Sequence, residues 1–281
     1  MATSEKSSST KTLDAAADLW YAVYEVIPMN IPESIRRVIG ERVSDTDRIG
    51  MSDATVLMFD DMVLKIGAPP EEIVMLRWLG GRVPVPEILA AEGEYLLMSR
   101  VPGEMLCKAA FTNRPQLLIE RLAEALHMLW RSDTDGCPYP DRTALALAEA
   151  RRRVEAGLCS TTDVEPDTYG SGGFASPEDL LAWLEANRPD ERPALSHGDF
   201  CLPNIFADEH GITGFIDVGR AGIADPYQDI ALAYRSLRHN YEGKYARPGM
   251  PQLEYDTLFD AVGIKPDFER IRYYTLLDEL F

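Results

Sequence analysis

Three polar side chains near position 200 have the types and the order that phosphoryl transfer requires. Asp199 and Asn204 lie five residues apart in the segment HGDFCLPNIF, and Asp217 follows the apolar run GFI after a turn at 209–211. In that chemistry one carboxylate positions the attacking hydroxyl and accepts its proton, while an amide oxygen and a second carboxylate hold magnesium against nucleotide phosphates. The order predicts Asp199 as the catalytic carboxylate, with Asn204 and Asp217 as the metal ligands.

The spacing between Asp199 and Asn204 is common by chance, so the prediction depends on the structural elements expected around these two residues. An apolar strand is expected on each side of the turn at 209–211. One loop can then hold Asp199 beside Asn204, and the second strand gives Asp217 a rigid base. The second acid therefore follows the loop in the order that the chemistry needs.

A positive charge for the phosphates is predicted at Lys65. This residue is the ionised member of the apolar run VLKI, and a buried ammonium group is costly unless it is paired. Glu72, at the start of the next predicted helix, is its natural partner, as in the strand lysine and helix glutamate of kinases. The alternative is an edge strand on which Lys65 faces water, and the three downstream polar residues disfavour it.

Short strands and helices are predicted to hold these residues in the first part of the chain. The two apolar runs on either side of Asp60-Asp61 are typical of a β-hairpin. The predicted helix that carries Glu72 begins after Pro69-Pro70 and ends at Gly80-Gly81. Helices are predicted at 31–41 and 71–79, and strands at 55–59, 62–66, 83–89 and 94–99.

From residue 102 onward the pattern becomes mostly helical. Leucines recur at three- and four-residue spacing over 118–129, which predicts an amphipathic helix in which His127 packs, and another helix is expected around 180–183. The stretch 159–175 is rich in Asp, Thr, Gly and Ser and is a predicted loop.

The expected domains are an N-terminal extension at 1–30, with a helix over 13–27, a nucleotide-binding lobe at 31–98, a hinge at 99–103 and a catalytic and substrate-binding lobe at 104–281. Two lobes predict a cleft.

The composition indicates an acidic globular protein. Its 281 residues carry 46 acidic and 28 basic side chains, a formal charge of −18, and 46% of them are apolar. Such a surface repels nucleic-acid phosphates, and no basic run exceeds Arg151-Arg152-Arg153, so we expect no nucleic-acid partner. A cationic small molecule would be attracted instead, although acidity also serves solubility alone.

The sequence contains no pattern typical of secretion or of membrane insertion. The four cysteines form no CxxC pair, which disfavours a disulfide framework and a zinc site. The first residues lack the apolar core of a signal peptide, and apolar residues never run for 18 positions. We therefore expect a cytoplasmic protein without a membrane partner.

The segment 197–230 resembles the aminoglycoside phosphotransferases, and most closely the type that modifies the 3′-hydroxyl, the kanamycin kinases. The segments 78–86 and 96–99 and the tail YYTLLDELF at 273–281 carry the same resemblance, which covers roughly residue 31 to the end. It implies an α+β, two-lobed protein-kinase-like fold with an antiparallel-sheet N-lobe and a mostly helical C-lobe. It also implies ATP, with GTP as the alternative donor, and Mg²⁺.

The resemblance assigns nucleotide-binding roles that agree with those argued from the residues. Lys65 would contact the phosphates while Glu72 holds it, Asp199 would be catalytic, and Asn204 and Asp217 would bind magnesium. A loop containing Gly50, Met51 and Ser52 would lie over the phosphates, and Met98 to Val101 would form the adenine-side hinge. In some relatives an aromatic residue two positions before the lysine stacks on the purine, whereas this chain has Val63 there.

The resemblance also points to an acidic substrate pocket. Aminoglycosides carry several ammonium groups, so carboxylates should line their site. Arg220 would help to hold the catalytic loop and the substrate region. The implied acidic groups are Asp278, Glu279, the Phe281 carboxylate and, from the loop before Pro177, Asp167 ahead of Glu165, with Asp163. His239-Asn240 would lie in a turn where some relatives place an acid.

The sequence therefore predicts transfer of a phosphoryl group from ATP to the 3′-hydroxyl of an aminoglycoside, which confers resistance. One alternative is a related small-molecule kinase for a macrolide, choline or a sugar, and the acidic C-terminus disfavours a neutral sugar. The other is a drug-binding pseudokinase without catalysis. Retention of Lys65, Asp199, Asn204 and Asp217 disfavours that alternative, because binding alone does not need all four.

Overall fold

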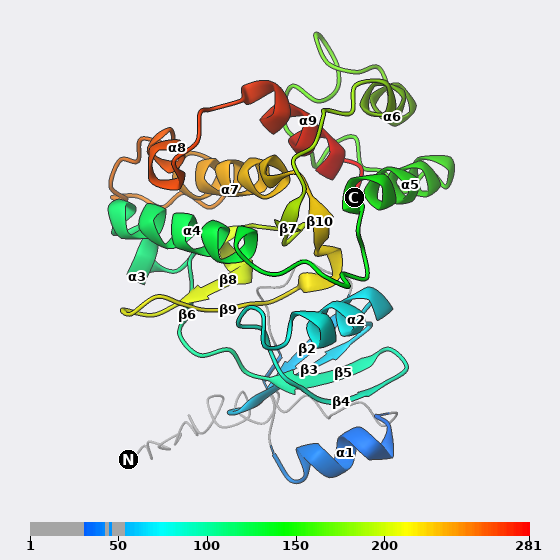
Figure 1. Ribbon diagram of the computed structural model, residues 1–281, viewed down its shortest axis with the longest axis vertical. Coiled ribbons are helices and arrows are strands. Elements are labelled where there is room, and N and C mark those ends of the chain that lie inside the picture. Colours follow the sequence, from blue (N-terminus) through cyan, green and yellow to red (C-terminus); the bar gives the residue numbers. More distant parts are fainter. Residues whose placement is uncertain (1–30, 43–44, 47–53) are drawn as a thin grey trace, which may run out of the picture.

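The computed structural model describes residues 31–42, 45–46 and 54–281. Within these ranges the N-terminal part contains a five-stranded antiparallel sheet with the strand order β1-β2-β3-β5-β4 (Figure 1). The strands are β1 (Asp45–Thr46), β2 (Thr55–Met58), β3 (Met62–Ile66), β4 (Ile88–Glu92) and β5 (Tyr95–Ser99). The predicted hairpin is confirmed, with Leu57 opposite Leu64 in the antiparallel pair β2–β3.

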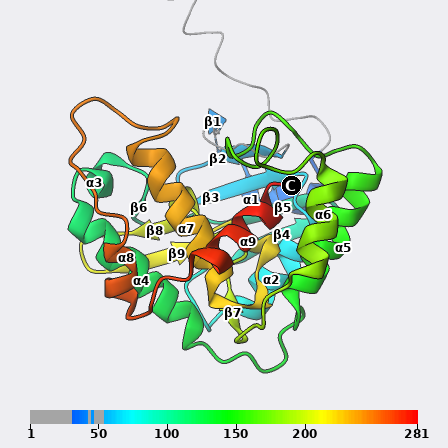
Figure 2. The same ribbon diagram turned by 90° about the horizontal axis from the view of Figure 1, so that it is seen from above.

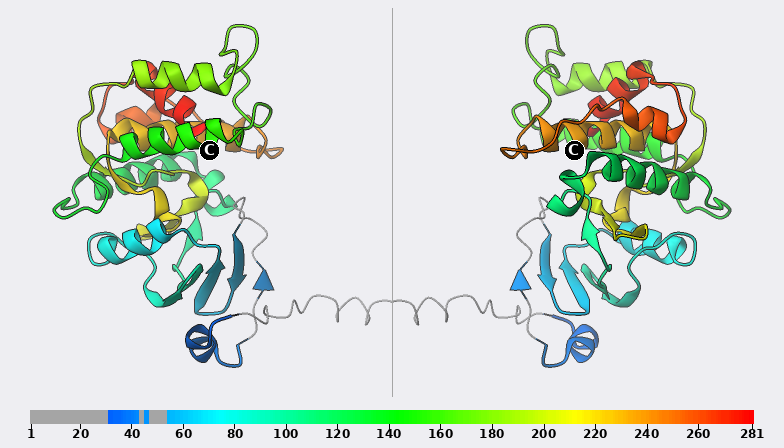
Figure 3. Two further views of the ribbon diagram at one scale, coloured as in Figure 1. Left: turned by 90° about the vertical axis from the view of Figure 1, so that its right-hand side faces the viewer. Right: turned by 90° about the vertical axis from the view of Figure 1, so that its left-hand side faces the viewer.

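Two helices cover opposite faces of this sheet. Helix α1 (Glu33–Ile39) packs through Ile35 and Ile39 against Leu64 and Leu97, at the end of the molecule farthest from the helical part (Figures 1 and 3). Helix α2 (Pro70–Leu79) belongs to the main core on the other face. Because side chains alternate along a strand, β3 directs Leu64 toward α1 and its neighbour Lys65 toward α2.

The C-terminal part is mostly helical, and several of its helices pack against two small sheets. The helices are α3 (Ala109–Thr112), α4 (Pro115–Trp130), α5 (Arg142–Glu155), α6 (Pro177–Ala186), α7 (Pro226–Tyr241), α8 (Thr257–Val262) and α9 (Phe268–Asp278). Helices α7 and α9 pack side by side, and the C-terminus lies beside the loop between α5 and α6 (Figure 2). The predicted helix over 118–129 is confirmed as α4, and His127 in it packs with Nε2 3.0 Å from the Val262 carbonyl.

Short strands and turns between α6 and α7 carry most of the chemistry-bearing residues. They are β7 (Ala194–Ser196), the 3₁₀ turn η1 (Leu202–Asn204), β8 (Ile205–Ala207), β9 (Ile212–Phe215), the 3₁₀ turn η2 (Val218–Arg220) and β10 (Gly222–Ala224). β7 pairs with β10, while β8 lies between β9 and β6 (Glu104–Met105). These pairings bring the loop after β7 and the turn after β9 to one place.

Two predicted elements differ from the structure. The strand predicted at 83–89 is wrong in its bounds: β4 runs from Ile88 to Glu92, because Pro84 and Pro86 lack the N–H groups that a ladder needs. The turn predicted at His239-Asn240 is also wrong, since both residues lie in the last turn of α7.

Several predictions stay untested by the described residues. The helix expected at 13–27 and the phosphate loop with Met51 and Ser52 lie outside them. The segment 99–103 links β5 to β6, and its role as a hinge stays a prediction. In the parts of the chain that the structure describes, no helix is long and apolar enough to cross a bilayer.

Candidate active site

Lys65 forms the centre of a buried ion-pair cluster. Its Nζ lies 2.8 Å from Glu72 Oε2 and 2.6 Å from Asp217 Oδ1. The Lys65 and Glu72 side chains are only 9% and 2% exposed, whereas Asp217 is 44% exposed. The predicted pair with Glu72 is confirmed, and the edge-strand alternative is wrong because β3 lies between β2 and β5.

The charges in this cluster stabilise one another against desolvation. Burial disfavours the charged ammonium group, but the carboxylates of Asp217 and Glu72 outweigh that effect and raise the pKa of Lys65. Burial raises the pKa of Glu72, and the nearby ammonium group opposes this shift. Lys65 therefore stays positively charged at neutral pH and faces the residues that follow β9.

The loop after β7 brings Asp199 and Asn204 into contact, as the sequence predicts. The Asn204 side-chain N–H₂ donates to the backbone carbonyl and to Oδ2 of Asp199, both at 3.0 Å. The Ile216 amide donates to the Asn204 carbonyl at 3.0 Å, one residue before Asp217. Two segments thus bring together the predicted catalytic carboxylate of Asp199 and the two predicted metal ligands, Asn204 and Asp217.

A buried aspartate that was not predicted from the sequence, Asp229, holds this loop through hydrogen bonds to its backbone. The Asp229 carboxylate accepts hydrogen bonds from the backbone amides of His197 at 2.8 Å and Gly198 at 3.0 Å, and from the Ser196 hydroxyl at 2.8 Å. Asp229 is fully buried in the first turn of α7. The sequence places Asp229 directly before the apolar run IALA, which suggests that the acid is buried. A buried acid needs several hydrogen-bond donors, so it could have been expected to bind a nearby backbone segment.

Gly198 allows the catalytic loop to touch the turn after Asp217. Its φ is +80°, and a Cβ atom there would lie 2.0 Å from the Arg220 carbonyl oxygen. A side chain would therefore push the backbones of the two site segments apart. Asp217 has a φ of 56° and is the non-glycine residue with a positive φ in the described chain, a strain that is typical of functional sites.

The contact at Gly198 predicts a large effect of one methyl group. Gly198→Ala should lower kcat/KM by about 100-fold, since displacing reacting groups by about 1 Å has this effect. Gly81→Ala is the matched control, because Gly81 has the same φ of +80° but nothing within 4 Å of its Cβ position. Steady-state kinetics of both variants check this, and equal losses would show that backbone strain, not the contact, is responsible.

Asn204 and Asp217 fit a magnesium ion held together with phosphates. Magnesium prefers oxygen ligands and usually takes one or two protein carboxylates plus substrate phosphates. The amide nitrogen of Asn204 already bonds to Asp199, so its amide oxygen is the atom suited to a metal. One protein carboxylate and one amide oxygen therefore suit a metal that also takes phosphate oxygens.

The predicted substrate residues at the C-terminus form an ion-pair network with two arginines. Arg220 Nη1 donates to Asp278 Oδ1 at 2.7 Å, and its guanidinium lies over the Phe281 ring at 4.4 Å. Arg235 pairs with Asp278 and, at 3.2 Å, with Glu279. Burial alone would raise the pKa of Asp278, but the two guanidinium groups outweigh it and hold that pKa below its usual value. Arg235 is not among the residues predicted from the sequence.

The three acids of the loop between α5 and α6 have separate surroundings. The Glu165 amide donates to Glu279 Oε2 at 3.2 Å, which joins Glu165 to the C-terminal network. Asp163 lies 3.7 Å from Lys244, and Asp167 lies 3.0 Å from Arg272, with both acids largely exposed. The structure thus connects Glu165, rather than Asp167, to the other predicted substrate residues.

Glu279 should make stability fall as the pH rises. Burial raises its pKa from 4.5 to about 7, since Arg235 is shared with Asp278 and only partly opposes burial. The folded state therefore binds this proton more tightly than the unfolded state. Relative to Glu279→Gln, the wild type should lose about 3 kcal/mol of unfolding free energy between about pH 4.5 and 7. Urea unfolding checks this, and a difference that does not change with pH would contradict it.

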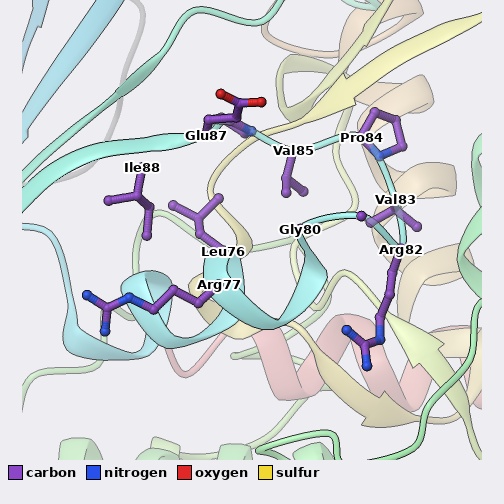
Figure 4. A pocket seen from close by; sticks show the side chains of 11 residues that line it. Leu76, Arg77, Gly80, Arg82, Val83, Pro84, Val85, Glu87 and Ile88 are labelled. Carbon is purple, nitrogen blue, oxygen red and sulfur yellow. The ribbon is translucent and has the colours of Figure 1, made fainter.

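The remaining predicted nucleotide residues lie at the link between the two parts. Met98 is buried in β5 opposite Val63, and Val101 packs against Gly214 in β9. A pocket of about 650 Å³ lies nearby, between α2 and the segment 81–88. Figure 4 shows Leu76, Val85 and Ile88 gathered at its centre. It contains no predicted site residue, so it is separate from the Lys65 cluster.

The chain is similar to known phosphotransferases in both sequence and structure. Residues 47–256 match the model of the phosphotransferase enzyme family. An aminoglycoside 3′-phosphotransferase of Niallia circulans is 34% identical over 90% of this chain and 98% of its own length. One of Staphylococcus aureus is 32% identical over 90% of this chain and 99% of its own. The crystal structure of aminoglycoside-3′-phosphotransferase of type VIII matches 88% of this chain and 98% of its own, with a TM-score of 0.70 and 28% identity.

Proposed function

The chain belongs to the phosphotransferase enzyme family, among the aminoglycoside 3′-phosphotransferases, and on this basis we propose that it transfers the γ-phosphoryl group of ATP to the 3′-hydroxyl of an aminoglycoside antibiotic. The ion pair between Lys65 and Asp217 is the observation that carries the proposal. It joins a cation on the sheet to the turn after the catalytic loop. A phosphate donor bound between these segments would meet both charges.

Asp199 is the group that we assign to the proton of the substrate hydroxyl. Its carboxylate orients the 3′-hydroxyl and takes its proton while the hydroxyl oxygen bonds to the γ-phosphorus. The bond from that phosphorus to the bridging oxygen of ADP breaks, so the products are the phosphorylated drug and ADP. Asn204 supports this role because its amide hydrogen bonds fix the Asp199 side chain.

Charge stabilisation is divided between the two parts of the chain. Lys65, held by Glu72, would contact the phosphate oxygens of ATP or, as the alternative donor, GTP. Asn204 and Asp217 would hold magnesium, which when bound supplies positive charge to the phosphates. The Lys65–Asp217 contact holds both groups in position relative to one another.

The C-terminal network is the proposed surface for the cationic drug. Its carboxylates, Glu165, Asp278 and Glu279, match the several ammonium groups of an aminoglycoside. A phosphate added to the drug would be repelled by the ribosomal RNA that the drug binds, which confers resistance. A cytoplasmic location suits the four unpaired cysteines and the supply of ATP.

A nucleotide-release assay tests this function. The purified protein with kanamycin, ATP and magnesium should release ADP at a rate that rises with drug concentration and saturates. The same mixture without kanamycin gives the background hydrolysis. ADP release that does not exceed this background over a panel of aminoglycosides would overturn the proposal.

A further inference from the structure

We propose that His239 is a specificity-determining residue of the substrate site, where its imidazole competes with a substrate ammonium group for the Glu165 carboxylate. The inference rests on the proposed function. It concerns one side chain in the last turn of α7 and one in the loop between α5 and α6. A direct contact joins these two elements.

The pair has the geometry of a strong, partly buried hydrogen bond. His239 Nε2 lies 2.6 Å from Glu165 Oε1, and the side chains are 33% and 16% exposed. The imidazole also contacts the Tyr245 ring edge-on, with centroids 6.5 Å apart. The hydrogen bond from His239 is the main cause that lowers the pKa of Glu165, so this carboxylate stays ionised.

Continuous contacts join the pair to the catalytic turn. Glu165 donates through its amide to Glu279, and Arg235 connects Glu279 with Asp278. Asp278 then pairs with Arg220, which lies three residues after the predicted metal ligand Asp217. The carboxylate that His239 contacts is therefore part of the surface expected to meet the cationic drug.

Competition follows from the charges around the imidazole. Arg235 and Arg238 on α7 also act on the Glu165 carboxylate, and Lys244 after that helix pairs with Asp163 in the loop. Histidine is the side-chain type whose charge ordinarily changes between about pH 5 and 8. When protonated, the imidazole supplies Glu165 with the charged donor that a substrate ammonium would supply, and it repels that ammonium. When neutral, it leaves the carboxylate to the drug.

Drug KM as a function of pH tests this competition. For kanamycin and for ATP, kcat and KM are measured at pH 6 and 8 with the wild type, His239→Asn and the control His210→Asn. His210 is a suitable control because its side chain is 83% exposed in the turn between β8 and β9. At pH 6, His239→Asn should lower the kanamycin KM about fivefold, with little change at pH 8. The KM for ATP should not change.

Comparing variants isolates the imidazole from other titrations. Glu279 and the drug amines also titrate near this range, but they are present in every protein tested. Glu165→Gln should raise the kanamycin KM at pH 8 and remove the effect of His239→Asn at pH 6.

The inference would be overturned if the ratio of the kanamycin KM of His239→Asn to that of the wild type were the same at pH 6 and at pH 8. A higher KM for His239→Asn at both pH values would show a structural role and also overturn it. Absence of kanamycin-dependent ADP release by the wild type at pH 8 would instead overturn the proposed function.

Discussion

Replacing Asp199 with asparagine should lower kcat by about 10²–10⁴-fold while ATP binding stays nearly unchanged. Asparagine keeps the shape of the side chain but cannot accept the proton of the attacking hydroxyl. The loop should persist, because the Asn204 amide can still donate to the Asp199 backbone carbonyl and Asp229 still holds the adjacent amides. Steady-state kinetics together with nucleotide titration measure both parts of the prediction.

The matched control is Asp260→Asn, which removes one exposed carboxylate in α8. It lowers the number of acids by the same amount and should leave kcat unchanged. If Asp199→Asn retains turnover close to that of the control, Asp199 is not the catalytic carboxylate.

Replacing Lys65 with methionine should affect both stability and catalysis. Removing the ammonium group leaves Glu72 buried without its partner, which should lower the unfolding free energy by about 3–5 kcal/mol. Asp217 adds less to this loss because it is 44% exposed to water. The missing charge on the phosphates should lower kcat/KM by about 10²–10³-fold. Chemical denaturation and ATP-dependent kinetics measure these separately.

A double variant separates the two effects. Lys65→Met with Glu72→Leu replaces the buried ion pair with apolar side chains of similar size, which should recover most of the stability but none of the activity. Lys265→Met, at an exposed position, controls for the lost lysine. Recovery of activity in the double variant would contradict the role of Lys65, because its only effect would then be on folding.

The contacts of Lys65 with Glu72 and of Asp199 with Asn204 could be predicted because their constraints are local. The spacing from Asp199 to Asn204 confines both to one loop, and Lys65 in an apolar strand requires a partner within reach of the next helix. In contrast, the apolar pattern alone predicted a strand at 83–89. Pro84 and Pro86 exclude a strand over the first part of that range, because they lack the N–H groups of a ladder.

The supporting contacts could not be predicted because they depend on how distant elements pack. Asp229 binds amides more than thirty residues earlier, and Arg235 reaches the C-terminus only because α7 packs against α9. The partners of the three acids in the loop between α5 and α6 could not be predicted for the same reason. Their charge is evident in the sequence, but the opposing side chains Lys244, His239 and Arg272 are placed by the fold.

The regiochemistry of phosphorylation tests the central claim most directly. The purified protein is incubated with ATP, magnesium and either kanamycin, which has a 3′-hydroxyl, or a 3′-deoxy aminoglycoside, and the drug is analysed by mass spectrometry and ³¹P NMR. We predict a product with one phosphate on the 3′-oxygen of kanamycin and no phosphorylated 3′-deoxy drug. Phosphorylation of both drugs at comparable rates, or of kanamycin at another hydroxyl, would contradict the assignment.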